Sequence, residues 1–528
     1  MSAPLLPFNI AVIAPFNAVP EGPFKLRLAA ADPEDPDAAL AEMRLSLSIS
    51  VPGHLSASGW LDLNIRAIKD FHPDGLIAAT PYLQNIADAR DFIRGALEKG
   101  DSGESIASGL RSWPDLPITV SAPAAAPGRP APSGGKVDDI LSMVAMPGES
   151  ASSPGGPVSG GVPRSWADDL DRILSQLMVN VFSNPDFRRF EESWRGLDLL
   201  VRSGLAGAGG KAGLKLCSMS LSALGDNLEK LEDALAADPP SLILMDLPFD
   251  SSPLSLDLLA RAAALGERML APVAASVDHR FFNLARWEDL HQLPYVPHYL
   301  DDAQFAKWRR LRGRPEGEWM TVLFNGFLGR PSYGGKNRPE RVQFVEGNRL
   351  YLSPVWALGC LAAQRLIKKG WPAGLGVGGA ARLSGLAVDN EAGRSTAAGL
   401  SGDRPDQFLA AGFSPLTGTP DQGSVALAGA VTVSGKSLDQ QMVLSRIIAL
   451  VLWLKDNLDP DAGPAETEIN FMAAFAEYFT ATGQEPPPDL KISVQETDSG
   501  RPWLVSISMT PGRDLSPSGQ KIELALNW

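Results

Sequence analysis

The N-terminal part of the chain shows short runs in which apolar and polar positions alternate. The alternation is strict in residues 45–51 (LSLSISV), which predicts a strand with one buried and one solvent-facing side. Three further runs predict strands, at residues 8–13, 24–29 and 60–65. Apolar residues then recur at helical spacing over residues 86–97, which predicts an amphipathic helix. Residues 1–113 are therefore predicted to form a small domain of strands followed by a helix.

Residues 114–164 break this pattern, because they are crowded with Ala, Pro, Gly and Ser. A segment of this composition buries too little apolar surface to order itself, so we expect a flexible linker. It contains one stretch with apolar residues at helical spacing, residues 136–146 (KVDDILSMVAM), which predicts a short helix. The linker divides the chain into a small part, residues 1–113, and a large part, residues 165–528.

In the large part, short apolar runs alternate with amphipathic helical patterns, which predicts an α/β layer. Residues 241–245 and 272–277 predict buried strands, and helices are predicted at 221–236, 254–265, 301–310 and 351–369. Three alternating runs close the chain, at 491–497, 503–509 and 521–527 (within residues 491–527), and predict an antiparallel strand cluster. The predicted fold class is α/β (mixed α+β): a small strand-plus-helix N-terminal domain, a flexible linker and a larger α/β domain.

One helix, residues 187–201 (FRRFEESWRGLDLLV), has a continuous apolar face and a charged opposite face. Phe187 and Trp194 belong to the apolar stripe, and Glu191, Arg195 and Asp198 lie beside it. We interpret these five residues as candidates for subunit packing. The three charged ones are expected to make polar contacts at a packed face or, equally, ion pairs within the chain.

Composition excludes several classes of protein. The 528 residues carry a net charge of −14, which lacks the basic excess typical of a nucleic-acid-binding surface. No apolar run is long enough for a membrane span, and the N-terminus lacks the basic region of a signal peptide, so we expect no direct membrane insertion. Cys217 and Cys360 are the only cysteines, which is typical of a protein in the reduced cytoplasm.

The candidate chemical motifs are weak. Residues 374–379 (GLGVGG) match G-x-G-x-x-G but follow a helix, whereas a dinucleotide site needs them between a strand and a helix. Residues 434–437 (SGKS) resemble the end of a Walker A loop, but Ala430 stands where its first glycine belongs. The five histidines have no metal-ligand spacing. We therefore expect no catalytic residues, no cofactor, no metal and no enzymatic activity.

Short sequence motifs, which we call words, resemble those of a known family in both parts of the chain. In the large part these are residues 184–201 (N-P-x-F, then E-x-x-W-R-G-L-x-x-L-V), residues 327–334 (FLGRPSYG), and a helix followed by Gly370-Trp371 and a glycine-rich segment. Their order resembles the large subunit of the type VI secretion contractile sheath. In the small part, residues 70–74 (DFHPD), between strands and a helix, resemble the small subunit of the same sheath. The chain is thus similar to a fusion of the two subunits.

This resemblance implies a structural protein that polymerises with itself into a helical tube around an inner-tube protein, attaches to a baseplate and contracts to propel the inner tube into a target cell. It also implies that terminal strands pair with neighbouring subunits. The polymer-interface candidates are therefore Phe8, Ile10, Val12, Trp503, Val505, Ile507, Ile522, Leu524 and Leu526. Residues 136–146 resemble the start of the large subunit, but the helical region that a AAA+ unfoldase recognises in the family does not follow. We therefore expect that the contracted form either is not recycled by such an unfoldase or is recognised by it through another surface.

Other interpretations remain open at this point. The sheath could belong to a phage-tail-like contractile injection particle. The glycine-rich segment could instead bind a nucleotide in a cytoplasmic enzyme that does not polymerise. A third possibility is a monomeric scaffold or adaptor.

Overall fold

The computed structural model describes residues 6–17, 28–31, 35–113, 115–118, 163–205, 211–376, 381–459, 462–497 and 500–528. Most of the expected linker, including the predicted helix at 136–146, lies outside these residues. Helices and strands are mixed as the sequence predicts, and the α/β domain closes with antiparallel strands, which confirms the predicted fold class.

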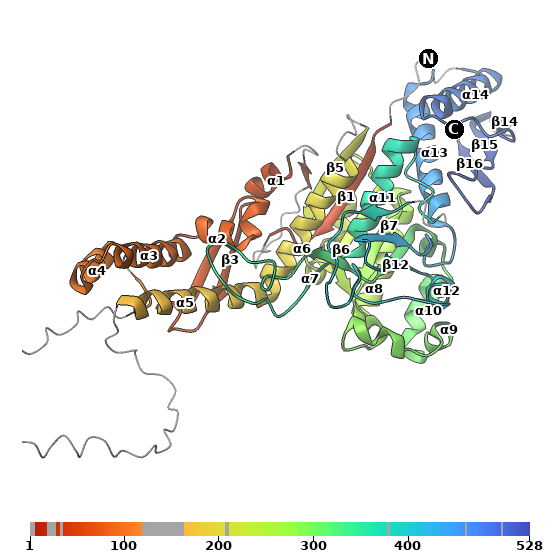
Figure 1. The fold of residues 1–528 in the computed structure, drawn as a ribbon. Helices are drawn as coiled ribbons and strands as arrows, with labels where there is room; N and C mark the ends of the chain where they lie inside the picture. Colours follow the sequence, from red (N-terminus) through yellow and green to blue (C-terminus); the bar gives the residue numbers. More distant parts are fainter. Residues whose placement is uncertain are drawn as a thin grey trace, which may run out of the picture.

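A large sheet forms the centre of the molecule (Figure 1). Its strands, in spatial order, are β11 (Leu383–Ser384), β13 (Ser424–Leu427), β12 (Phe413–Thr419), β8 (Met320–Phe324), β7 (Val273–Val277), β6 (Leu242–Phe249), β1 (Phe8–Ala14), β5 (Ala212–Ser218) and β2 (Leu28–Ala31). The strands from β12 to β5 run parallel, and β13, β11 and β2 are antiparallel to their neighbours. A parallel sheet of this kind needs cover on both faces, which explains its nearly continuous apolar strands.

Strand β1 comes from the small part, yet it lies between β5 and β6 and is parallel to both. Its residues alternate between the two cores of the molecule: Ile10 and Val12 pack on one side of the sheet, and Ala11 and Ile13 on the other. The domain bounds expected for residues 1–113 stay a prediction, and β1 is the strand that crosses from them into the large sheet. In space, the small and large parts share one sheet.

Helices cover both faces of this sheet. Helices α7 (Leu221–Ala236) and α8 (Pro253–Met269) pack on one face, whereas α6 (Pro185–Leu200) and α11 (Pro354–Lys369) pack on the other. Helix α11 begins at Pro354, later than predicted, because residues 350–352 form strand β10 and proline is favoured at the first helical position.

The rest of the small part extends away from the sheet as an arm along α5 (Pro163–Ser183), as Figure 1 shows. It consists of α1 (Pro36–Met43), the hairpin β3 (Leu45–Ser50) and β4 (Trp60–Ile65), α2 (Pro73–Ala79), α3 (Pro81–Glu98) and α4 (Gly103–Gly109). In the hairpin, Leu61, Leu63 and Ile65 are buried and the residues between them are exposed, as strict alternation requires.

The remaining elements of the large part surround the sheet or close the chain. They are α9 (Val296–Tyr299), α10 (Ala306–Arg312), β9 (Phe327–Arg330), β10 (Leu350–Leu352), α12 (Arg404–Ala410), α13 (Leu438–Asn457), α14 (Pro464–Ala481), β14 (Lys491–Thr497), β15 (Gly500–Met509) and β16 (Ile522–Asn527), with single helical turns at Val201–Leu205, His279–Phe282, Trp287–Gln292, Ala303–Phe305 and Pro315–Trp319. The small part has two further single turns, Ile68–Phe71 and Leu110–Ser112. Among the described residues, no helix is long and apolar enough to cross a membrane.

Candidate functional site

Three of the sequence words meet where the small part joins the large part. Helix α6 carries the first word, strand β9 and the loop after it carry the second, and the turn before α2 carries the third. Asn184 fixes the start of α6, because its side-chain oxygen accepts the Phe187 amide at 2.9 Å and Pro185 follows at the first helical position. We call this region the joint.

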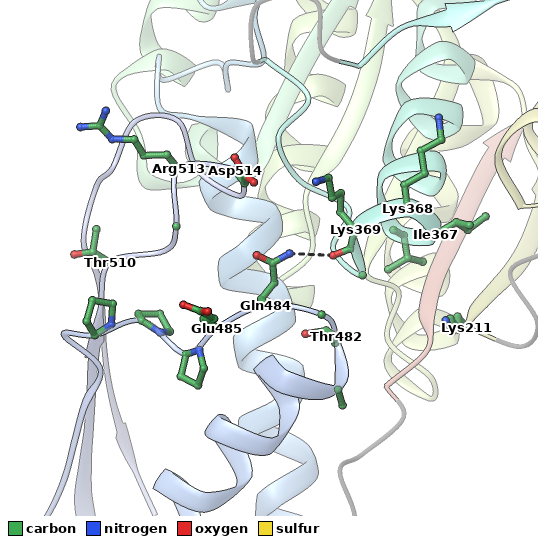
Figure 2. A pocket seen from close by; sticks show the side chains of 18 residues that line it. Lys211, Ile367, Lys368, Lys369, Thr482, Gln484, Glu485, Thr510, Arg513 and Asp514 are labelled. Atoms are coloured by element: carbon green, nitrogen blue, oxygen red, sulfur yellow. Dashed lines mark hydrogen bonds between the residues drawn. The ribbon is translucent and has the colours of Figure 1, made fainter.

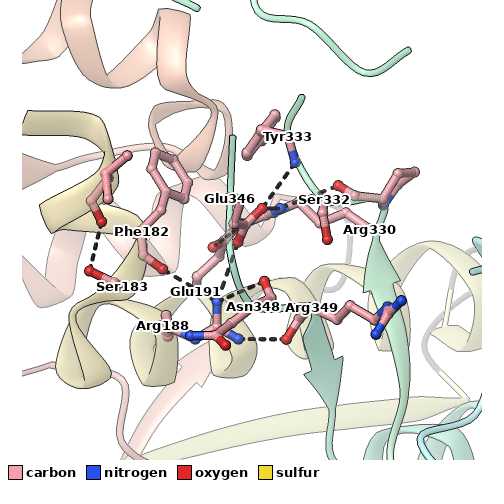
Figure 3. Close-up of polar contacts among 12 residues, drawn as sticks. Phe182, Ser183, Arg188, Glu191, Arg330, Ser332, Tyr333, Glu346, Asn348 and Arg349 are labelled. Carbon is pink, nitrogen blue, oxygen red and sulfur yellow. Dashed lines mark hydrogen bonds and ion pairs between the residues drawn. The ribbon is translucent and has the colours of Figure 1, made fainter. Parts of the chain in front are cut away.

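The centre of the joint is a buried carboxylate, Glu191 of α6. It accepts two hydrogen bonds from Arg330 of β9, with Nε to Oε1 at 2.7 Å and Nη2 to Oε2 at 3.0 Å. Arg195, one turn further along α6, donates Nε to the same carboxylate at 2.7 Å. Figure 3 shows how the Glu191 and Arg330 side chains converge from α6 and β9. The fork of Arg330 thus grips a carboxylate that has no access to water.

The same guanidinium grips a second carboxylate, Glu346 in the loop before β10. Arg330 donates Nη1 to Oε2 at 2.6 Å and Nη2 to Oε1 at 3.0 Å. Glu346 also accepts the Tyr333 amide at 3.1 Å and Nη1 of Arg188 at 3.3 Å. The five charged residues of this ion cluster are Arg188, Glu191, Arg195, Arg330 and Glu346. Three cations and two anions therefore balance to within one charge.

The attraction between these opposite charges outweighs the energetic cost of removing them from water. Burial alone raises the pKa of Glu191, but Arg330 and Arg195 outweigh it and hold the pKa below its ordinary value. For Arg330, burial works against the charged form, yet Glu191 and Glu346 raise its pKa above the usual range. Its guanidinium also lies 4.3 Å from the centre of the Tyr333 ring. Both groups therefore remain charged inside the protein.

A second buried cluster lies on the side of α6 that faces the large sheet. Asp246 sits at a bulge of β6, where the pairing with β7 skips a register. Its carboxylate accepts Nη2 of Arg189 at 3.2 Å, Nε1 of Trp356 at 2.9 Å and the Ser193 hydroxyl at 3.4 Å. Arg189 also donates to the backbone oxygen of Asp246. One carboxylate thus ties α6, β6 and α11 together.

Glu192 shares the guanidinium of Arg189, with Oε2 at 2.8 Å from Nη1. Burial and the nearby Asp246 raise the pKa of Glu192 to about 7, although Arg189 pulls it down. Two carboxylates with one guanidinium between them leave an excess negative charge, which favours holding a proton. Glu191 and Glu192, neighbours in sequence, therefore have pKa values shifted in opposite directions.

The small part is attached to the joint through residues 70–74 (DFHPD). Asp74 accepts the backbone amides of Glu340 at 2.9 Å and of Arg341 at 2.8 Å, so it holds the loop between β9 and β10. Phe71 is fully buried, and its ring lies 5.6 Å from that of Phe187 on α6.

The other two polar residues of this word shape and extend the contact. Asp70 folds the turn itself, because its carboxylate accepts the amides of Arg66 at 2.9 Å and Ala67 at 3.0 Å. The His72 ring lies 5.4 Å from that of Tyr333. Each residue of the word except proline thus has a distinct contact.

The structure brings four of the five subunit-packing candidates together in this region. Phe187 and Trp194 are buried, and Trp194 donates Nε1 to the Phe16 oxygen of the small part at 2.8 Å. Glu191 and Arg195 pair within the ion cluster. Asp198 lies apart and pairs with Arg202 at 2.6 Å near the surface. The charged candidates thus form ion pairs within this chain, one of the two alternatives that the sequence left open.

Sequence reasoning missed three members of the ion cluster: Arg188, which lies on α6 beside the candidates, Arg330 and Glu346. Arg330 ends a short apolar strand within FLGR, and a lone cation after apolar strand residues was the available signal. Glu346 lies in an irregular loop and had no signal, because only the folding of the loop brings its carboxylate to Arg330.

The polymer-interface candidates fall into two different situations. Phe8, Ile10 and Val12 lie in β1, whose two edges are both paired within the chain. Trp503, Val505 and Ile507 lie in β15, the middle strand of the C-terminal sheet (β14, β15 and β16). Ile522, Leu524 and Leu526 lie in β16, at one edge of this sheet. Strand β1 therefore has no free edge for a neighbouring copy, whereas β16 has an edge without a partner strand in the described chain.

The two edges of the C-terminal sheet differ. Trp503 and Trp528 exchange both backbone hydrogen bonds, at 2.9 and 2.8 Å, so the amides of Glu523, Ala525 and Asn527 point to the open edge of β16. At the opposite edge, the Val494 amide of β14 donates to the Glu468 carboxylate of α14 at 3.1 Å. The β14 edge is thus partly capped by a side chain, and the β16 edge is available for another strand.

The glycine-rich segment is held from inside the protein. Asp439, buried in the first turn of α13, accepts the amides of Leu375 at 2.7 Å and Gly376 at 3.2 Å. These amides are therefore already occupied by a carboxylate, and residues 377–380 lie outside the described residues. Within the described part of the chain, no group of His, Cys, Asp and Glu side chains is arranged to hold a metal ion.

Comparison with known families identifies both parts of the chain. A family model described as EvpB/VC_A0108, tail sheath N-terminal domain, matches residues 165–434, more than half of the chain. A second model, described as type VI secretion system, VipA, VC_A0107 or Hcp2, matches residues 3–111. The two matches fall on the large and the small part, and both reach the joint.

Individual proteins are similar over shorter stretches. The type VI secretion system sheath protein TssC1 of Pseudomonas aeruginosa is 23% identical over 196 residues, which cover 34% of this chain and 39% of that protein. The chain thus spans well under half the length of this curated relative.

Two solved structures are more distant. The sheath tail protein of Desulfitobacterium hafniense is 11% identical, with a TM-score of 0.34 over 58% of this chain and 60% of that one. The baseplate of the anti-feeding prophage is 13% identical, with a TM-score of 0.33 over 63% and 76%. Both TM-scores are too low for either structure to bear on the fold of this chain.

Proposed function

The chain belongs to the type VI secretion tail-sheath family and joins its large-subunit and small-subunit regions in one polypeptide, and on this premise we propose that it is the repeating subunit of a contractile sheath. In this proposal many copies form a helical tube around an inner tube, in the cytoplasm, and rest on a baseplate. Contraction of the tube drives the inner tube toward a target cell. The role is structural and involves no bond-making chemistry.

The observation that carries this proposal is the open edge of β16. A sheet of three strands that leaves one edge unpaired, while a carboxylate caps the other edge, is suited to accept a strand from a neighbouring copy. Backbone hydrogen bonds along β16 then link the copies. The apolar residues Ile522, Leu524 and Leu526 pack with the main hydrophobic core of the chain, and an added strand extends the sheet beside them.

The structure of the joint also supports the proposal. A contractile machine needs protomers that move as rigid bodies while the contacts between them change. Here Phe187 and Trp194 of α6 contact Phe71 and Phe16 of the small part, and β1 of the small part completes the large sheet. We propose that this joint stays intact during contraction and that the C-terminal sheet carries the flexible links.

Recycling is proposed to differ from that of sheaths that an unfoldase dismantles. Residues 136–146 lead into a run of Pro, Gly and Ser instead of a long helical region. We propose that the contracted polymer is not extracted by an unfoldase through this segment.

Electron microscopy of the purified full-length chain tests the function. We expect hollow striated tubes from the complete chain, and only single subunits from a chain that ends at Gln520 and lacks β16. Because this truncation also uncovers part of the core, a finer variant is needed.

The variant Ala525→Pro meets this need. Its ring removes an amide that points to the open edge and does not take part in the pairing with β15. The subunit should keep its thermal melting temperature and lose tube formation. Compact monomers from the unaltered chain at high concentration, with or without an inner-tube protein, contradict the sheath function. Tubes that survive Ala525→Pro contradict strand addition at β16.

A further inference from the structure

A large polar groove lies between the body of the molecule and the C-terminal sheet. Its volume is about 840 Å³, and it is lined by the end of α11, the connection from α14 to β14 and the loop between β15 and β16. Figure 2 shows Lys368 and Lys369 of α11 on one side and Arg513 and Asp514 of the loop on the other. We call this feature the basic groove.

The charges in the basic groove are not balanced. Four cations line it, Lys211, Lys368, Lys369 and Arg513, against the two anions Glu485 and Asp514. All six side chains belong to exposed residues, and the ion pairs found among the described residues include none of them. In a chain with a net charge of −14, an excess of two positive charges in one cavity is a distinct local feature.

The walls of the groove are firmly held. Gln484 donates Nε2 to the Lys369 oxygen at 3.2 Å, and Arg365 donates Nη2 to the Asp514 oxygen at 2.9 Å. Trp371 donates Nε1 to the Thr482 hydroxyl at 2.9 Å. Apolar surface is present as well, from the partly exposed Ile367 and three successive prolines, 486–488. The groove therefore combines fixed shape, positive charge and some apolar lining.

An exposed segment with two adjacent acidic residues lies elsewhere on the chain. Around α9, the Tyr295 side chain is 60% exposed and the Asp301 side chain 69% exposed, and Asp302 is exposed beside it. The His298 ring of the same segment lies 3.9 Å from the Asp301 carboxylate, so Asp301 has one weak, exposed partner within the chain. The segment is rigid, because Arg309 donates to the Leu300 oxygen at 2.8 Å and the Asp302 oxygen at 2.6 Å. We call residues 295–302 the acidic tip.

The groove and the tip lie at opposite ends of the body of the molecule. In Figure 1, α9 and α10 are at the lower end of the body, whereas α14 and the C-terminal sheet are at the upper end. A surface at one end that fits a different surface at the other end joins copies head to tail. Such a contact does not close on itself in a pair, and it produces rings or open helical polymers.

We propose that the basic groove of one copy receives the acidic tip of a second copy of this chain. Asp301 and Asp302 lie among the lysines, and the Tyr295 ring packs against the prolines and Ile367. Both surfaces are held rigid before they meet, which lowers the entropic cost of the contact. This contact rests on the proposed sheath function and adds to it a side-chain interface that is separate from strand addition at β16.

Charge reversal with rescue tests the contact. The groove variant is Lys368→Glu with Lys369→Glu. The tip variant is Asp301→Lys with Asp302→Asn, in which the new amide side chain keeps an oxygen for the cap on the Gln304 amide. Each variant alone should raise the concentration needed for tube formation about tenfold or more, because like charges then face each other or an attraction is lost. The combination of both should restore assembly to within about threefold of the original chain.

A matched control reverses two exposed lysines outside the groove, Lys99→Glu with Lys455→Glu, and should leave assembly unchanged. Sedimentation and electron microscopy measure assembly, and thermal melting confirms that each variant folds. If the unaltered chain forms tubes and the groove variant does so equally well, or if the combination fails to recover, the groove contact is wrong while the sheath function stands. If the folded, unaltered chain forms no tubes, the sheath function fails and this contact fails with it.

Discussion

The joint and the C-terminal sheet differ in whether their polar groups find partners within one chain. In the joint, each carboxylate of the ion cluster meets a guanidinium, and both edges of β1 have partner strands. In the C-terminal sheet, β16 leaves a row of backbone amides without a partner strand in the described chain. All these contacts of the joint form when one chain folds, whereas the open edge of β16 can be paired only by a second chain.

This difference indicates where rigidity and adaptability lie. Buried ion pairs are intolerant of displacement, because a separated charge in a dry interior is very costly. Backbone pairing at a sheet edge depends little on side-chain identity and tolerates twisting. A protomer built in this way can move as one body while its links to neighbours bend.

The largest effect is expected from Arg330→Ala in the joint. It leaves the buried Glu191 and Glu346 without their shared guanidinium, and removing one partner of a buried ion pair costs about 3–5 kcal/mol in the free energy of unfolding. Urea unfolding followed by tryptophan fluorescence measures the loss. As a control, Arg202→Ala removes an ion pair whose arginine side chain is 72% exposed and should cost less than about 1 kcal/mol.

Arg330→Lys sharpens this result. Lysine keeps the charge but has no planar fork to hold two carboxylates, so it should recover only part of the lost stability. Equal stability of the Arg330→Ala variant and the unaltered chain would mean that the cluster is not the centre of the joint.

The second prediction concerns pH and the Asp246 cluster. The pKa of Glu192 is about 7 in the folded protein and 4.5 in its ordinary state. The folded state therefore binds a proton that the unfolded state has released, and stability declines as pH rises from about 4.5 to 7. Glu192→Gln mimics the protonated form and should remove about 2–3 kcal/mol of this decline.

Unfolding free energies measured at pH 5 and pH 8 check this expectation. Glu229→Gln, on the exposed face of α7, is the matched control and should keep the decline of the unaltered chain. An identical pH dependence with and without Glu192 would show that this carboxylate is not the group that holds the proton.

Much of this fold could be predicted from the sequence, because periodicity reports which face of an element is buried. Helix α7 and strands β4 and β14 have the predicted bounds. The position of β1 could not be predicted in this way. Its apolar residues, FNIAVIA, indicate burial on both faces, but nothing local specifies that β5 and β6 are the strands on either side.

The site was predictable only in part, for a similar reason. Glu191 and Arg195 lie one helical turn apart, so the sequence alone places them together. The partners Arg330 and Glu346 come from a strand and a loop more than a hundred residues away, and only tertiary folding joins them. Likewise, the difference between the two edges of the C-terminal sheet depends on Glu468, which a strand pattern does not include.

The third prediction tests how closely the joint is packed. Gly196 is the glycine of the W-R-G word, and a Cβ added there would lie 2.3 Å from Cε2 of Trp356 on α11. Gly196→Ala should therefore cost about 1–3 kcal/mol, because the buried indole has little room to move. Gly95→Ala on α3, where a Cβ meets no atom within 4 Å, is the control and should not destabilise the protein. If Gly196→Ala is as stable as the unaltered chain, α6 and α11 are not tightly packed at this position.

The smallest effect on stability is expected in the C-terminal sheet, from Glu468→Ala. This change removes the carboxylate that accepts the Val494 amide, and one such hydrogen bond contributes about 0.5–1.5 kcal/mol. Its effect on association should be larger than its effect on folding, because β14 then exposes a second pairing edge. Light scattering and electron microscopy should show branched or laterally joined assemblies, whereas Glu466→Ala, in the first turn of the same helix, should give ordinary ones. If Glu468→Ala leaves the assemblies unchanged, the capped edge does not direct pairing, and the contrast between a closed joint and a sheet open at one edge has to be abandoned.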